Sequence, residues 1–92
     1  MRQRRDSLVI MAKVVEAAAV LDKPTITRIQ YYVGLPFSRT REYVNYLLKL
    51  GLLREIDSGR LRIFRPTERG LAFLSEFRKL VKMLGIGEYL GE

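Results

Sequence analysis

The 92-residue chain contains neither cysteine nor histidine. These absences exclude disulfides and thiol nucleophiles, and they remove the usual zinc ligands and the usual general base at neutral pH. The ten acidic residues are scattered singly, and none forms a recognisable catalytic spacing. We therefore expect no enzymatic activity, no metal site and no cofactor, and no small-molecule ligand is evident.

Long hydrophobic runs are also missing. No segment approaches the ~20 apolar residues that a membrane-spanning helix requires. The beginning of the chain, MRQRRDSLVIMAKVVEAAAV, is similar to a signal peptide in its basic start and apolar stretch, but Lys13 and Glu16 interrupt that stretch. The sequence predicts a soluble protein of the cytoplasm.

Acidic residues are too few to balance the basic ones. The chain has 17 lysines and arginines and a net charge of +7, and twelve of the 17 are arginine. Arginine donates a planar pair of hydrogen bonds to phosphates and guanine edges, whereas lysine is a point charge. The excess favours a phosphate-rich partner such as nucleic acid, although an inert basic surface would have the same composition.

The chain is long enough for one domain, and its pattern predicts four helices and a hairpin. Apolar residues recur at helical spacing over residues 8–21, 26–33, 38–50 and 68–84. Two β-prone runs, 52–57 and 60–66, flank Ser58 and Gly59 as a two-residue turn. Because Ile63 and Phe64 fall on opposite faces of the second run, we expect a twist or bulge near residue 63.

A short turn containing Gly34 joins the second and third predicted helices, which is typical of a helix-turn-helix, and the hairpin would be its wing. We predict a mainly α, winged helix-turn-helix fold with a three-helix core, a two-stranded wing and a long C-terminal helix. In the third helix, the 3.6-residue period directs inward Thr40, Val44, Leu47 and Leu48. The same period leaves on the outside Ser38, Arg39, Arg41, Glu42 and Asn45, with Tyr46 and Lys49 towards the rim.

These outward side chains have the chemistry of base recognition. Arginine can pair with guanine, asparagine with adenine, and glutamate can accept from cytosine. An ordinary solvated helix face carries the same residue types, so the basic hairpin is needed to favour DNA. We expect Arg39, Arg41 and Asn45 to contact bases. The predicted DNA-binding residues are Arg28, Ser38, Arg39, Arg41, Glu42, Asn45, Arg60 and Arg62.

Two further groups of residues carry weaker expectations. Arg2, Arg4 and Arg5 form a basic arm ahead of the first helix, which we expect to be disordered. The tyrosines lie on helices rather than on an open sheet, so they are unlike the stacking platforms of single-strand binders. We expect core or rim positions for Tyr31 or Tyr32 and for Tyr43.

The last predicted helix has two apolar stripes, whereas a helix resting on one core needs only one. One stripe contains Leu74, Phe77, Val81 and Leu84. The other contains Phe73, Phe77, Leu80 and Leu84. The spare stripe predicts a partner, and the expected dimerisation residues are Phe73, Phe77, Leu80, Val81 and Leu84.

The string TRIQYYVGLPFSRTREYVNYLLKLGLL, followed by a hairpin and PTERGLAFLSEF, resembles archaeal winged-helix proteins that pair through a C-terminal helix. These are small, basic, chromatin-associated or regulator-like DNA-binding proteins, and the resemblance covers roughly residues 7–84. It implies a nucleoid-associated homodimer that binds double-stranded DNA. Residues 1–92 would then form a single domain, with a core at 7–66, a dimerisation helix at 67–84 and a tail at 85–92.

The last helix is shorter than the extended coiled coils of that family. The first helix, or the tail with Ile86, Tyr89 and Leu90, is therefore expected to supply part of the dimer interface. The alternative hypothesis is a winged-helix module that binds another protein in a larger assembly and does not contact DNA. That hypothesis predicts an exposed apolar patch on the third helix, whereas the pattern there is polar and basic.

Overall fold

The structure, a computed structural model, describes residues 2–85, with side chains described from residue 7 onward. The elements follow in the order α1 (Arg2–Val20), α2 (Ile26–Val33), α3 (Phe37–Lys49), β1 (Leu53–Ser58), β2 (Leu61–Pro66) and α4 (Glu68–Leu84). This order confirms the predicted three-helix core, two-stranded wing and long last helix. None of the helices within residues 2–85 combines the length and the apolar character needed to cross a bilayer.

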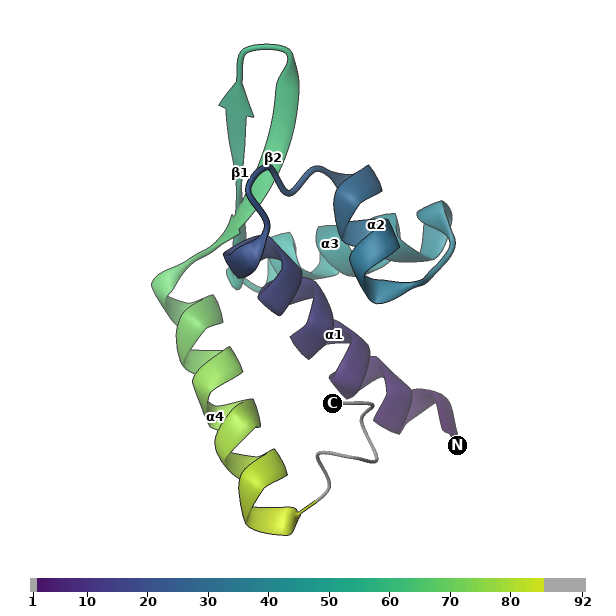
Figure 1. The fold of residues 1–92 in the computed structure, drawn as a ribbon, viewed down its shortest axis with the longest axis vertical. Coiled ribbons are helices and arrows are strands. Elements are labelled where there is room, and N and C mark those ends of the chain that lie inside the picture. Colours follow the sequence, from purple (N-terminus) through teal and green to yellow (C-terminus); the bar gives the residue numbers. More distant parts are fainter. Residues whose placement is uncertain (1, 86–92) are drawn as a thin grey trace.

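Helix α1 is the centre of the fold. It contacts α2, α3, α4 and β2, and Figure 1 shows it running between α4 on one side and α2 with α3 on the other, while the hairpin stands out at one end. Its side chains Val14, Val15, Ala17 and Ala18 are completely buried. The nearly all-round apolar pattern of the first helix is therefore explained by several partners within the same chain.

The N-terminal arm differs from the expectation. Helix α1 begins at Arg2, so the backbone of the predicted disordered arm continues the helix. No glycine or proline interrupts the chain before Pro24, and arginine and glutamine are good helix formers, which accounts for the extension. The side chains of Arg2, Arg4 and Arg5 lie outside the described part of the structure.

Local capping fixes both ends of α2, the first helix of the helix-turn-helix. The side chain of Thr25 accepts a hydrogen bond from the Arg28 backbone N–H at 3.2 Å, which caps the start of α2. At the other end, Gly34 adopts the left-handed conformation (φ 79°), which glycine reaches without steric cost. Only residues 34–36 connect α2 to α3.

The hairpin has a regular register and no bulge. Pairing is continuous from Leu53 opposite Pro66 to Ser58 opposite Leu61, so the turn residues are Gly59 and Arg60. The predicted turn was therefore wrong by one residue. Gly59 has a positive φ of 67°, as the first central position of a type II′ turn requires.

The predicted bulge near residue 63 is also wrong. Phe64 is buried at the base of the hairpin, whereas its neighbour Ile63 pairs with Ile56 on the opposite face, where both are half-buried. The apolar residues of β2 therefore change face without a bulge, because Phe64 is buried on one face of the hairpin and Ile63 lies beside Ile56 on the other. The Phe64 backbone N–H also donates to the Pro24 carbonyl oxygen at 3.0 Å, which attaches the base of the wing to the segment before α2.

Arg65 connects the wing to α1 and does not extend into solvent. Its guanidinium donates three hydrogen bonds at the C-terminal end of α1, to the carbonyl oxygens of Ala18 (3.1 Å), Leu21 (2.8 Å) and Asp22 (2.8 Å). A cation is favoured there because the helix dipole leaves negative partial charge on these unpaired carbonyls. The hairpin arginines are therefore not equivalent, and Arg65 has a structural role.

The start of α4 is held tightly against the loop after α3. The Thr67 hydroxyl accepts from the Gly70 N–H at 3.0 Å and donates to the Gly51 carbonyl at 2.6 Å. Gly70 is buried against the carbonyl group of Leu52, so that a β-carbon at this position would overlap the Leu52 carbonyl oxygen. Only glycine allows this approach, and it sets the direction in which α4 leaves the core.

Candidate nucleic-acid interface

The two faces of α3 are divided as the 3.6-residue period predicts. Thr40, Val44 and Leu47 are completely buried and Leu48 is half-buried. The Thr40 hydroxyl donates to the Pro36 carbonyl oxygen at 3.1 Å, so this buried polar group is satisfied. The exposed side chains, which we call the outer face of α3, are Ser38, Arg39, Arg41, Glu42 and Asn45.

The outer face is not neutralised by the protein itself. Within the described residues, the side chains of Arg41, Glu42 and Asn45 make no hydrogen bond or ion pair. The first turn of α3 contains no acidic residue, and its N-cap Pro36 makes no side-chain capping bond. Arg39 and Arg41 therefore lie near the positive end of a helix dipole. An anionic partner bound there would reduce the repulsion between these positive charges.

Arg39 differs from Arg41 in its surroundings. Its guanidinium carbon lies 5.8 Å from the centre of the Tyr43 ring, within the range of a cation–π contact. The Tyr43 hydroxyl lies 3.0 Å from the Ser7 Oγ of α1. The 3.6-residue period places both arginines on the outer face, but the i, i+4 spacing of Arg39 and Tyr43 is a signal in the sequence that distinguishes them.

The tyrosine expectations hold only in part. Tyr43 is half-buried against the core, as expected for the rim. Tyr31 and Tyr32, one of which was expected in the core or rim, are both exposed, by 79% and 42%. The reason is the short α2, in which Ile29 already fills the position facing α1 and α3.

Arg28 and the wing arginines lie outside α3. Arg28 is exposed in the first turn of α2, and Arg60 is exposed at the tip of the hairpin. Arg62 is 76% exposed and forms an ion pair with Glu55, with 3.2 Å between Nε and Oε2. Such a surface pair contributes little stability, so Arg62 can exchange Glu55 for a phosphate at small cost.

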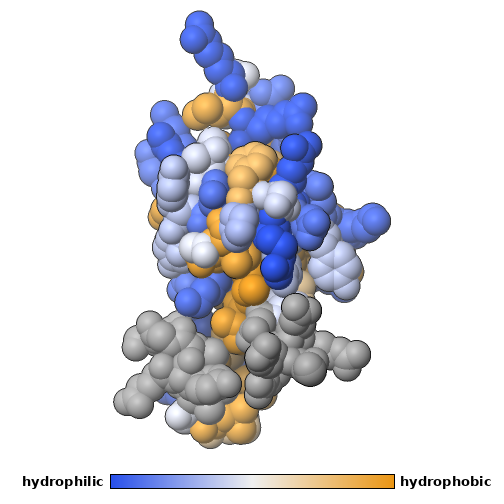
Figure 2. All heavy atoms as spheres, turned by 90° about the vertical axis from the view of Figure 1, so that its right-hand side faces the viewer, coloured by the Kyte–Doolittle hydropathy of each residue, from blue (hydrophilic) through white to orange (hydrophobic). Residues whose placement is uncertain are grey.

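The wing is less basic than the number of its arginines suggests. Arg65 is committed to α1, and Glu55 and Asp57 carry negative charge on β1. The arginines left exposed are Arg54, Arg60 and Arg62. Figure 2, which views the molecule from the right-hand side of Figure 1, shows hydrophilic residues over most of its upper part, including the tip of the wing.

A second exposed surface, of different character, lies on α4. Leu74 is buried, and Phe73 and Phe77 are half-buried against the core with their rings 6.4 Å apart. Val81 is also half-buried. By contrast, Leu80 is 49% exposed and Leu84 is 62% exposed. Apolar atoms accordingly appear at the lower end of the molecule in Figure 2, where Figure 1 places the last turns of α4. Residues of the two predicted stripes thus pack against the core in the first half of α4 and are exposed towards its end.

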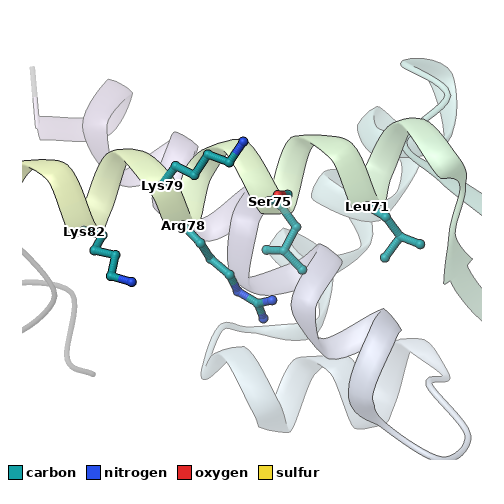
Figure 3. A pocket seen from close by; sticks show the side chains of 6 residues that line it. Leu71, Ser75, Arg78, Lys79 and Lys82 are labelled. Carbon is teal, nitrogen blue, oxygen red and sulfur yellow. The ribbon is translucent and has the colours of Figure 1, made fainter.

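A shallow groove follows the outward side of α4. Figure 3 shows Leu71, Ser75, Arg78, Lys79 and Lys82 lining it, and Leu74 also contributes. Arg78 forms an ion pair with Glu16 of α1 at 3.1 Å, and Lys79 forms one with Glu76 at 3.4 Å. The groove is therefore bordered by cations that mostly have partners already.

Solved structures share this fold. The chain is similar to a protein of unknown function from Listeria innocua, with 17% identity and a TM-score of 0.74 over 89% of this chain and 58% of that chain. It is similar to the DNA-binding protein Sso10a-2 from Sulfolobus solfataricus, with 23% identity and a TM-score of 0.72 over 85% of this chain and 80% of that one. The PcaV transcriptional regulator from Streptomyces coelicolor gives 23% identity and a TM-score of 0.74, over 83% and 56% of the two chains.

The chain spans slightly more than half the length of the Listeria and Streptomyces proteins. Among curated protein sequences, none matches it. The model of one family, described as winged helix-turn-helix, matches residues 4–85. Because that match covers α1 from residue 4 onward, the other three helices and both strands of the wing, the chain belongs to the winged helix-turn-helix family.

Proposed function

We propose that the protein binds double-stranded DNA and has no enzymatic activity, acting in the cytoplasm as a transcription regulator or a nucleoid-associated protein. The observation that carries this proposal is the outer face of α3, the second helix of a helix-turn-helix, where Arg41, Glu42 and Asn45 are exposed and make no hydrogen bond or ion pair with another described residue. In this type of fold, that helix enters the major groove with its N-terminal residues leading. Membership of the family and the similarity to the DNA-binding protein Sso10a-2 and the transcriptional regulator PcaV support the same function.

The residues divide into base contacts and phosphate contacts. Arg39, Arg41 and Asn45 contact base edges in this proposal, since their side chains offer the donors and acceptors that base pairs present in the major groove. Glu42 can accept from a cytosine amino group. The residues proposed for the phosphate backbone are Arg28, Ser38, Arg60 and Arg62.

Salt dependence tests duplex binding directly. With four to eight phosphates contacted, the logarithm of the binding constant should fall against the logarithm of salt concentration with a slope of roughly −4 to −7, because each contact releases condensed counterions. Fluorescence anisotropy with a labelled mixed-sequence duplex over a range of salt concentrations measures this slope. Absence of binding at low salt would remove the DNA proposal.

The alternative, a winged-helix module that binds protein, is favoured by one observation. Four aromatic side chains on α2 and α3 are exposed: Tyr31, Tyr32, Phe37 and Tyr46. They make the surface less uniformly polar than the sequence pattern indicated. The salt titration separates the two functions, since a protein-binding module without affinity for DNA gives no slope to measure.

We further propose that the protein is a homodimer paired through α4. The exposed part of the apolar stripe, Leu80 and Leu84, is the surface that a second copy would cover, continuing the half-buried row of Phe73, Phe77 and Val81. The contribution of α1 that the sequence predicts would come from its own exposed apolar residues, Leu8 and Val20, which lie near opposite ends of that helix. The tail residues Ile86, Tyr89 and Leu90, expected to assist, lie outside the described residues.

Replacing Leu80 and Leu84 together with glutamate is expected to convert dimers to monomers without unfolding the protein. Both side chains are largely exposed, so the charges would disturb an interface between copies rather than the core; Phe73, being half-buried against it, is a poorer choice. Sedimentation equilibrium measures the mass. A matched variant, Ala72→Glu with Ser75→Glu, adds the same charge on the outward side of α4 and should remain dimeric; the reverse pattern would move the interface to the groove in Figure 3.

A further inference from the structure

We propose that Tyr43 is a positioning residue that holds the Arg39 guanidinium ready for DNA, and that Ser7 of α1 fixes Tyr43 in turn. This inference rests on the proposed function, since it concerns how one predicted DNA contact is arranged. It assigns a role to a tyrosine that lies beside the outer face of α3 and not on it, and it gives α1 an influence on DNA recognition.

The geometry forms a chain of three side chains from two helices. The Arg39 guanidinium carbon lies 5.8 Å from the Tyr43 ring centre, and the Tyr43 hydroxyl lies 3.0 Å from Ser7 Oγ. The ring itself is half-buried and packs against the core. Tyr43 is therefore held both by packing and at its hydroxyl, so its face is a fixed surface on which the mobile arginine side chain can rest.

The contact does not compete with DNA binding. When guanidinium and ring are stacked, a cation–π contact uses the flat face of the guanidinium, whereas hydrogen bonds to a guanine edge or a phosphate use the N–H groups at its rim, in the plane of the group. Arg39 can keep the ring beneath it and still donate to DNA. The ring also restricts the rotamers of a long side chain before binding, so that less conformational entropy is lost when the DNA contact forms.

Arg41 provides an internal comparison. It is exposed on the same helix, but within the described residues no aromatic ring lies beneath its guanidinium. If Tyr43 acts on Arg39, its removal should matter only when Arg39 is present and should be independent of Arg41. A purely structural role for Tyr43 would instead weaken binding in every background.

A double-mutant cycle tests this. In otherwise unchanged protein, Tyr43→Leu is expected to weaken binding to a mixed-sequence duplex by roughly two- to fivefold, the range of an exposed cation–π contact. The same change should cause no further loss in an Arg39→Ala background but the full loss in an Arg41→Ala background. Tyr43→Phe keeps the ring but loses the hydroxyl that contacts Ser7, so its affinity is expected to fall by less than that of Tyr43→Leu.

A loss from Tyr43→Leu that persists without Arg39 would overturn the inference, as would an unchanged or increased affinity. If Arg39→Ala itself has no effect on duplex binding, Arg39 is not a contact and the inference fails while DNA binding stands. If the unchanged protein does not bind the duplex at all, the proposed function fails and this inference fails with it. These outcomes are distinguishable within one set of titrations.

A measurement on the folded, unchanged protein guards against a Tyr43→Leu variant that does not fold. Because the guanidinium lies over the ring face, the ring current should move the Arg39 side-chain Nε–H resonance upfield of that of Arg41 in the NMR spectrum. The shift should remain in Tyr43→Phe. Equal positions for Arg39 and Arg41 in the unchanged protein would show that the side chain is not held on the ring, which contradicts the inference.

Discussion

Replacing Arg39 and Arg41 together with alanine is expected to weaken duplex binding by about 1–3 kcal/mol for each arginine, roughly 30-fold or more for the pair. Both side chains are exposed near the N-terminal end of α3, where a helix-turn-helix approaches the bases most closely. Neither takes part in an ion pair within the described residues. Their loss should therefore leave the fold intact, and the thermal unfolding transition should change little.

A charge-matched control separates a specific contact from the general effect of net charge. The variant Arg69→Ala with Lys82→Ala removes the same two positive charges from exposed positions on α4. It is expected to retain most of the affinity at moderate salt, because screening weakens the attraction of distant charges. Equal losses from the two variants would show that the protein binds DNA through its overall charge, and an unaffected Arg39 and Arg41 variant would show that α3 does not contact it.

Gly70→Ala is expected to reduce the free energy of unfolding by about 1–3 kcal/mol. In an ordinary helix interior this substitution would stabilise the protein by about 0.5–1 kcal/mol, since alanine loses less backbone entropy than glycine. Here the added methyl group would overlap the Leu52 carbonyl oxygen, which is rigid backbone and cannot turn aside. Either α4 moves away from the core or the Gly51–Leu52 segment shifts, and both outcomes disturb the Thr67 cap.

Urea unfolding of Gly70→Ala, followed by circular dichroism, gives the change in stability. Ser75→Ala, at an exposed position in the same helix, is the control and should change stability by no more than about 0.5 kcal/mol. The sign is decisive: a Gly70→Ala protein more stable than the parent would mean that α4 does not approach Leu52 as closely as the structure places it.

The helices and the buried side of α3 could be predicted because they depend on local rules. The 3.6-residue period places Thr40, Val44 and Leu47 on one side of α3 in any fold that buries that side. Capping is equally local, and Thr25 and Thr67 begin their helices as residues of their type do. The contact roles of the outer-face residues stay predictions, since burial alone does not identify a partner.

The hairpin shows where local rules stop. Composition placed the turn at Ser58 and Gly59. In the structure Ser58 pairs with Leu61, so the turn residues are Gly59 and Arg60. The apolar pattern of β2 suggested a bulge because Ile63 and Phe64 are both apolar but fall on opposite faces of a regular strand. The pattern alone does not show that both faces of the hairpin are partly buried at these positions. Only the packing of Phe64 against the core and of Ile63 against Ile56 resolves this.

By itself, the sequence determined the helix-turn-helix with its wing, the basic character of the surface and the sides of α3, because periodicity, capping and net charge are properties of neighbouring residues. The tertiary structure alone decided which arginines are available. It placed Arg65 on the carbonyls that end α1, Arg62 beside Glu55 and Arg39 over Tyr43. Two of these partnerships join elements that are distant in the chain or cross the hairpin. The third pair, Arg39 and Tyr43, lies four residues apart on α3, and there the tertiary structure adds the contact between Tyr43 and Ser7 of α1, which spacing in the sequence does not specify.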